Sequence, residues 1–259
     1  MNQLGAIGAA FLQQWKTSLS NIGSMAQILG IIPPAIVVTW IGLQSKDPAV
    51  ITYVTVGVPL MAIWNGVIFN VGWSLNRELG YGTLGFVIIS QTQMLTVLIG
   101  KTLAQIAIST PVGIIGLVIM LLISFQVPSV ADPGLLVFSL FLMIIALLVT
   151  SLLFAPLMVI VGGRGGFFNA IMPFGVVLSG FYFPIDSLPV ALQVIARILP
   201  TSWAMNGVWQ SIRGIESWWS IISAWGMCLL TSFAIFCFTY WLFQIVEKRI
   251  RNTGSLATF

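Results

Sequence analysis

Charged residues are scarce in this chain, and histidine is absent. Of its 259 residues only 6% are charged, whereas 58% are hydrophobic. A soluble domain carries about 25% charged residues, so this chain has too little polar surface to cover itself in water. Without histidine it also lacks the side chain that most often serves as a general base or a metal ligand. The composition therefore predicts an integral membrane protein.

Cysteines and basic runs are also rare. Cys228 and Cys237 are too far apart along one predicted helix to form a disulfide. The net charge of +4 is small, and no block of Lys and Arg is long enough to follow a nucleic-acid backbone. Metal-ligand spacing and a G-x-x-x-x-G-K-[ST] phosphate loop are missing as well. We therefore expect membrane lipids around the protein, with no nucleic acid and no metal.

Long apolar runs are what the sequence does contain, and they predict an all-α fold. Six runs can cross a membrane, which takes about 20 helical residues, with a tilt or a break in the shorter ones. They cover approximately residues 28–43, 51–75, 102–125, 135–161, 167–184 and 218–246, within one transmembrane domain over 26–259. Every charged residue falls between these runs or at their ends. Residues 79–100 are also uncharged, but their clustered glycines and polar side chains favour a loop over a seventh span.

Residues 1–25 precede the first run and show an amphipathic pattern. Apolar residues recur at spacings of three and four, while Gln, Lys, Thr, Ser and Asn fill the other face. The apolar residues are Leu4, Ile7, Phe11, Trp15, Leu19 and Ile22. This pattern predicts a helix lying in the membrane interface, and a soluble helix packed on a partner is the alternative.

The basic residues predict the orientation of the six spans. With both termini on one side, that side receives seven of the ten basic residues: Lys16, Arg77, Lys101, Arg164, Lys248, Arg249 and Arg251. Cytoplasmic loops carry an excess of Lys and Arg. We therefore expect a multi-pass protein of the plasma membrane with both termini in the cytoplasm, residues 77–100 inside and residues 184–214 outside.

The stretch from Leu178 to Arg213 is broken by Pro184, Pro189 and Pro200. Proline removes a backbone donor and clashes with the preceding turn, so one straight helix cannot pass through all three. The pieces between them predict two short helices, capped by Ser187 and by Thr201 or Ser202, with Gly214 ending the second. Broken backbone near a bilayer is tolerated where it is buried or lines a cavity. The stretch is thus a candidate external lid of re-entrant helices, or else an ordinary surface loop.

Two further sets of residues are candidates for function. The first is a cytoplasmic coupling segment with a short helix that could receive movement from a partner; a plain interfacial loop is the alternative. Its residues are Arg77, Glu78, Gly82, Thr83, Leu84, Val87 and Ile88. The second is a polar and aromatic stripe on the second span that could line a passage, although such residues also join packed helices. Its residues are Asn65, Phe69, Gly72, Trp73 and Asn76. Beneath the lid, Phe181, Tyr182 and Phe183 could close the passage or belong to an aromatic belt.

Two motifs in this sequence resemble motifs of the ABC-2 type permeases. SGFYFPIDSLP followed by ILPTSWAMNGVWQSIR is similar to the family's Phe-Pro and Leu-Pro pattern, which ends in an amphipathic segment. RELGYGTLGF with the later Gly100-Lys101 is similar to its cytoplasmic coupling region, although Gly85 stands where relatives often carry an acidic residue. The resemblance covers essentially the whole chain and is somewhat greater to the drug and antibiotic exporters.

The resemblance implies that this chain is the membrane subunit of an ATP-driven exporter. Two permease chains pair, here as an expected homodimer, and two separate ATP-binding-cassette subunits bind ATP and Mg. The chain itself is then neither an enzyme nor a cofactor carrier. The implied substrate is a hydrophobic or amphipathic drug, antibiotic or lipid, with a lipid-linked polysaccharide as the alternative. A membrane-embedded lipid-modifying enzyme and a passive channel are rival hypotheses.

Overall fold

The structure is a computed structural model, and it describes residues 3–20, 33, 36–37, 40–41, 44, 48–80, 93–124, 129–160, 165–215 and 217–253. These residues are helical apart from short connections, and no strand occurs among them. The elements are α1 (Gln3–Ser20), α3 (Pro48–Gly80), α5 (Met94–Ser124), α6 (Pro133–Ile160), α7 (Gly165–Leu178), the 3-10 helix η1 (Ile185–Ser187), α8 (Val190–Ala196), α9 (Pro200–Arg213) and α10 (Trp218–Thr253). The predicted all-α class is confirmed for this part of the chain.

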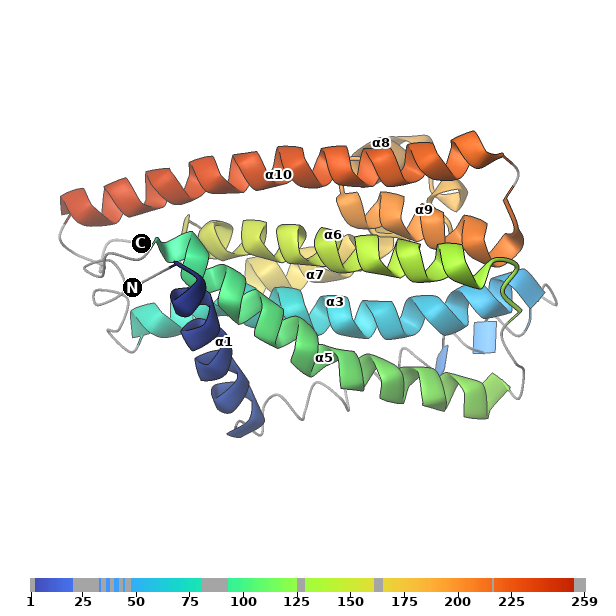
Figure 1. Ribbon diagram of the computed structural model, residues 1–259, viewed down its shortest axis with the longest axis horizontal. Coiled ribbons are helices and arrows are strands. Elements are labelled where there is room, and N and C mark those ends of the chain that lie inside the picture. The colour runs from blue at the N-terminus through green and yellow to red at the C-terminus, as the bar shows by residue number, and fades with distance from the viewer. Residues whose placement is uncertain are drawn as a thin grey trace.

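Four long helices, α3, α5, α6 and α10, run along the length of the molecule (Figure 1). Each contains a stretch that is long and apolar enough to cross a membrane. The stretches are Ala49–Ser74, Met94–Leu122, Pro133–Met158 and Trp218–Lys248. The predicted spans 51–75, 135–161 and 218–246 agree with three of them to within a few residues, whereas the predicted span 28–43 lies mostly outside the described residues.

The third predicted span, 102–125, begins too late. α5 starts at Met94, so the end of the predicted loop 79–100 forms its first two turns, and the helix includes Lys101. The expectation that no charged residue lies inside a span is therefore wrong at this position. Lys101 is tolerated there because its side chain is buried in an ion pair with Glu78 of α3 rather than exposed to lipid.

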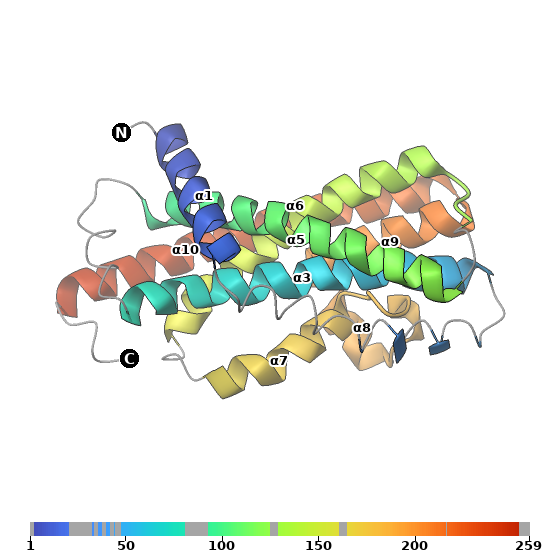
Figure 2. The same ribbon diagram turned by 90° about the horizontal axis from the view of Figure 1, so that it is seen from below.

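The fifth predicted span, 167–184, extends too far. α7 ends at Leu178, and Gly180 follows in a left-handed conformation with φ of 78°, which glycine adopts without steric cost. The helix is shorter than the roughly 20 residues that cross a bilayer. In Figure 2, α7 lies to one side of α3 and leads to α8.

The core lies where α3, α6 and α9 meet. Large side chains such as Met61 and Trp64 of α3, Met143 and Leu147 of α6, and Met205 of α9 are almost completely buried there. α9 also packs against α10, so this short helix fills the space between two long ones (Figure 1). The part of the chain that follows α7 thus closes the bundle at the end where α9 lies.

Ser139 of α6 makes polar side-chain contacts with both α10 and α9. The indole N–H of Trp225 on α10 donates to the Ser139 hydroxyl on α6 at 3.0 Å. The Ser139 and Ser211 hydroxyls are 3.5 Å apart, and Ser211 belongs to α9. Such hydrogen bonds between helices contribute about 0.6 kcal/mol each in a membrane, and here they also fix the register of three helices.

Candidate functional site

A buried ion pair joins α3 to α5 at the end of the molecule where α1 lies. The Lys101 ammonium donates to the Glu78 carboxylate and, at 3.4 Å, to the Ser74 hydroxyl. The side chains of Lys101 and Glu78 are only 6% and 12% exposed. Removing one partner of such a pair leaves a buried charge that costs several kcal/mol. The pair therefore fixes the two helix ends that flank residues 81–92.

Two more polar contacts occur at this end. The Arg77 guanidinium donates to the backbone carbonyl of Asn70 at 3.0 Å, and the backbone N–H of Met94 donates to the Glu247 carboxylate at 3.3 Å. Glu247 thereby joins α10 to the start of α5. Of the predicted coupling residues, Arg77 and Glu78 belong to this junction. The others, Gly82, Thr83, Leu84, Val87 and Ile88, lie outside the described residues.

α1 packs across α5 with the face that carries its small and polar side chains. A Cβ atom at Gly100 would lie 2.9 Å from the Cβ of Ala10 and would collide with the Ile7 carbonyl oxygen, so only glycine permits this crossing. Beyond the crossing point, Gln14 and Ser18 both donate to the side-chain carbonyl of Gln105 at 3.3 Å. The large residues Leu4, Leu12 and Leu19 face away from α5 and are exposed. The amphipathic pattern predicted the helix but not its polar contact with α5.

The polar and aromatic stripe of α3 divides between two environments. Gly72 faces α6, where an added Cβ would lie 3.6 Å from Met158 Cγ. Phe69 is 40% exposed, and its ring centroid lies 6.1 Å from that of the half-buried Trp73. Asn65 is half-buried, and the side chain of Asn76 lies outside the described residues. Phe69 is thus the residue of the stripe that the described part of the chain leaves exposed.

The segment that follows α7 closes against α3. Phe181 is completely buried, and its ring lies 6.3 Å from the Trp64 ring in an edge-on arrangement. The Tyr53 hydroxyl donates to the Gly180 carbonyl. At Gly57 an added Cβ would collide with the Phe181 carbonyl oxygen, so the absence of a side chain lets the segment approach the helix. Tyr182 and Phe183, which were predicted with Phe181, are half-buried.

Sequence reasoning missed the α3 side of this contact. Tyr53, Gly57 and Trp64 carry no motif of their own, and they meet the segment around Phe181 only after the chain has folded back over more than a hundred residues. The weak signal that could have found them is spacing: 53, 57 and 64 share one face of a helix at 100° per residue, and that face bears two of the largest aromatic rings.

Both predicted lid helices form, but their caps differ from those predicted. α8 follows Pro189 and α9 follows Leu199, with Pro200 in the first turn, and neither cap makes a side-chain hydrogen bond. Thr201 is instead buried, 2.8 Å from the Ser179 hydroxyl. The expected caps, Ser187 and Thr201 or Ser202, are therefore wrong: Pro189 and Leu199 hold the cap positions, and Pro200 begins α9 because its fixed φ suits the first turn of a helix. The predicted end at Gly214 is confirmed, with φ of 99°.

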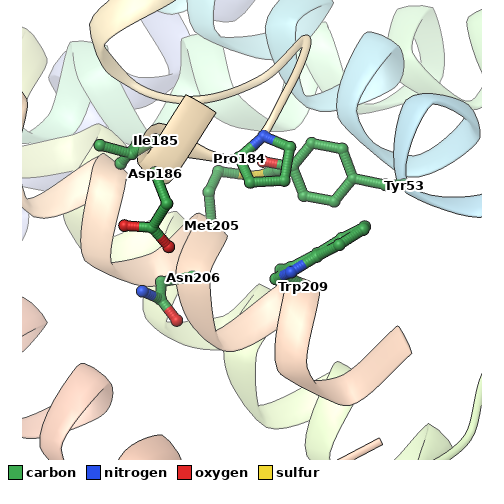
Figure 3. Close-up of a pocket in the computed structure, with 7 residues that line it drawn as sticks. All are labelled: Tyr53, Pro184, Ile185, Asp186, Met205, Asn206 and Trp209. Atoms are coloured by element: carbon green, nitrogen blue, oxygen red, sulfur yellow. The ribbon is translucent and has the colours of Figure 1, made fainter. Parts of the chain in front are cut away.

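A narrow cleft lies where this lid meets α3. Figure 3 shows Tyr53 and Trp209 on one side, Asp186 and Asn206 on the other, and Met205 between them. The Tyr53 and Trp209 rings meet edge to face with centroids 4.8 Å apart. Pro184, one of the three predicted prolines, also lines the cleft. The arrangement offers aromatic packing and hydrogen-bonding groups, and in the described residues no group of acidic, cysteine or histidine side chains could hold a metal.

The family pattern of ABC-2 family transporter proteins matches residues 1–241, which is nearly the whole chain. The chain belongs to the ABC-2 transporter family. The match includes α1, the Glu78–Lys101 pair and the lid, and it ends before Glu247. The comparison with curated proteins gives no match.

Membership makes this ABC-2 protein a membrane component of a transport system. Proteins of the family are permeases that are generally not catalytic themselves, and they partner with ATP-binding subunits. The four long apolar helices agree with a multi-pass membrane protein.

Proposed function

We propose that this chain is the permease subunit of an exporter that moves a hydrophobic or amphipathic substrate out of the cytoplasm or the inner leaflet. ATP and Mg are bound and used by two separate ATP-binding-cassette subunits. Two copies of the chain form the pathway, each with six spans and with both termini in the cytoplasm of the cell. The proposal rests on the family match together with one observation, the buried Glu78–Lys101 pair.

The ion pair supports coupling because of its position. It joins the end of α3 to the start of α5, so residues 81–92 leave and return to two helices that are held together. Glu247 extends the connection to α10, and Gly100 with Gln105 extends it to α1. A displacement applied to the coupling segment by a partner subunit would therefore move four helices as one body rather than bend a loop.

The opposite end supports the role of an exit. The Phe181 ring packs on Trp64, and the Tyr53 hydroxyl donates to the Gly180 carbonyl beside it; neither contact involves a charge. Contacts of this kind can separate without exposing an unpaired ion to lipid. The exposed Phe69 lies on the same helix as Tyr53, which suits a pathway surface that a second chain completes. We therefore assign Asn65, Phe69, Gly72, Trp73 and Asn76 to the pathway and Phe181, Tyr182 and Phe183 to its gate.

The decisive experiment is reconstitution with and without the ATP-binding subunit. The chain alone in liposomes should neither hydrolyse ATP nor transport a fluorescent hydrophobic drug, and addition of the ATP-binding-cassette protein that co-purifies with it should give both activities. The Leu84→Arg variant should still insert in the membrane but lose substrate-stimulated ATP hydrolysis. Transport by the chain alone, or full activity of Leu84→Arg, would contradict the proposal.

A further inference from the structure

A second, larger pocket lies beside the cleft of Figure 3, at the end of the molecule opposite α1. Its volume is about 240 Å³, and it shares Asp186, Asn206 and Trp209 with the cleft. From there it extends past Gln210 and Arg213 of α9 to Ser220 at the start of α10. None of these residues belongs to the coupling segment, the stripe or the gate, so the proposed transport function does not account for the pocket.

Opposite charges face this pocket. The Asp186 carboxylate lies 3.8 Å from Arg197, and both side chains are more than half exposed, so this ion pair contributes little. The Arg213 guanidinium lies over the Trp209 ring, 5.7 Å from its centroid. Within the described part of the chain no carboxylate pairs with Arg213. The pocket thus offers one anionic and one cationic group to a ligand.

A buried acceptor gives a third, independent indication. The Gln210 side-chain N–H donates to the Asn206 side-chain carbonyl at 2.7 Å, which fixes the orientation of the Gln210 amide. Its own carbonyl oxygen, Oε1, is buried and has no hydrogen-bond partner among the described residues. Buried polar atoms are normally satisfied, and because Gln210 lines the pocket, rotation of its side chain would present this oxygen to a ligand there.

We propose that this pocket binds a zwitterionic headgroup that carries a primary ammonium and a phosphate. The ammonium has three donors and suits the Asp186 carboxylate and, once the Gln210 side chain rotates, its carbonyl. The phosphate suits Arg213, whose planar guanidinium pairs well with phosphate oxygens. A headgroup with only an anion would leave the Gln210 carbonyl without a donor and Asp186 with Arg197 alone, and a neutral ligand would leave Arg213 without an anion.

The surroundings of the pocket favour a membrane lipid as the source of this headgroup. Ser220 follows directly after Trp218 and Trp219, whose side chains are 66% and 77% exposed, and Ile222 beyond it is also exposed. On the side of Asp186, α8 exposes the large apolar side chains of Val190, Val194 and Ile195. Apolar surface therefore borders the polar pocket on both sides, where acyl chains of a bound lipid can lie.

The test measures binding of short-chain lipids to the purified full-length chain in non-ionic detergent micelles by isothermal titration calorimetry. Dihexanoyl-phosphatidylethanolamine should bind, and dihexanoyl-phosphatidylglycerol, which lacks the ammonium, should bind at least about tenfold more weakly, the effect of one charge-assisted hydrogen bond. Arg213→Gln should weaken phosphatidylethanolamine binding by about tenfold. Asp186→Asn should remove the preference for phosphatidylethanolamine over phosphatidylglycerol.

Arg197→Gln provides the matched control, because Arg197 carries the same charge near Asp186 but does not line the pocket. Its binding should stay within about twofold of the unchanged chain. Phosphoethanolamine that binds as tightly as the lipid would support the headgroup chemistry and identify a soluble ligand. Equal binding of the two lipids, or undiminished binding by a folded Arg213→Gln chain, would overturn the proposal. The assay uses no nucleotide, so its failure would leave the transport proposal untouched.

Discussion

At the α1 end of the bundle, α3 is joined to α5 by a buried ion pair, whereas at the α9 end it contacts the segment around Phe181 through aromatic rings. Glu78 and Lys101 form the first contact, and Tyr53, Trp64 and Phe181 form the second. Each end also depends on a glycine at a close approach, Gly100 or Gly57. One helix thus carries a polar junction at one end and an apolar junction at the other.

This difference determines how each end responds to a force that pulls its two partners apart. Separating Glu78 from Lys101 would leave two charges in a poorly solvated place, so this junction strongly resists opening. Aromatic contacts lose their stabilisation gradually as the rings move apart, and no charge is uncovered. The polar end is therefore suited to transmitting a displacement, and the aromatic end is suited to opening and closing. Four substitutions test this contrast, from the largest expected effect to the smallest.

Lys101→Met should cause the largest loss of stability. Glu78 would remain buried without its partner, which costs about 3–5 kcal/mol in the free energy of unfolding. The measurement is unfolding of the purified chain by dodecyl sulfate in mixed micelles. The double variant Glu78→Gln, Lys101→Met should recover most of the loss, and Lys248→Met at an exposed site of α10 should change little. A loss below about 1 kcal/mol for the single variant would show that this end does not depend on the ion pair.

Gly57→Ala should come second, at the aromatic end. Its Cβ would collide with the backbone oxygen of Phe181, and such overpacking costs about 1–3 kcal/mol. The loss of stability is measured by the same unfolding assay. We also expect a faster, ATP-independent leak of substrate from liposomes that contain this variant. Gly226→Ala is the matched control, because its Cβ meets no atom within 4 Å and alanine favours a helix. Equal stability of the two variants would mean that the segment around Phe181 does not rest against α3.

Tyr53→Phe should have a smaller effect. It removes only the hydroxyl that donates to the Gly180 carbonyl, and a hydrogen bond of this kind contributes about 1 kcal/mol. Deuterium uptake should rise in residues 179–184, while the aromatic packing on Trp209 is kept. Tyr240→Phe, at an exposed position of α10, should leave this uptake unchanged. Unaltered uptake in the Tyr53→Phe variant would show that the hydroxyl does not help to hold residues 179–184 against α3.

Gln105→Leu should have the smallest effect. It deletes the acceptor shared by Gln14 and Ser18, and hydrogen bonds between helices in membranes average about 0.6 kcal/mol. Deuterium uptake in α1 should increase, because the polar face of this helix loses its partner on α5. The exposed Gln244 of α10 offers the comparison variant Gln244→Leu, which should not affect α1. A destabilisation as large as that of Lys101→Met would make α1 part of the main junction.

The sequence predicted the long helices well because their signal is local. The run of apolar residues that became α6 fixed both ends to within a few residues, since Asp132 and the glycines after residue 161 interrupt it. The start of α5 could not be found in this way. Lys101 looks like the end of a span until its pairing with Glu78 is known, and that pairing depends on tertiary structure.

The candidate site shows the same limit. Proline spacing predicted the break after α7 and the two short helices, because a proline acts on its own turn. The sequence did not identify Tyr53, Trp209 or the buried Gln210 carbonyl as site residues. They come together in one site only when α3, η1 and α9 pack against one another. The caps were mispredicted because, with Pro189 and Pro200 at the helix starts, the cap positions fall two or three residues away from the expected Ser and Thr.

The placement of α9 between α6 and α10 has a practical consequence. Its first residues, Pro200 to Ser202, are buried, whereas its last residue, Arg213, is exposed at the end of the bundle. A nanobody or inhibitor that binds the exposed end of α9 would therefore act on the Ser139–Ser211 and Ser139–Trp225 contacts inside the bundle. Through this helix, a reagent bound at the surface of the protein can change the packing of its interior.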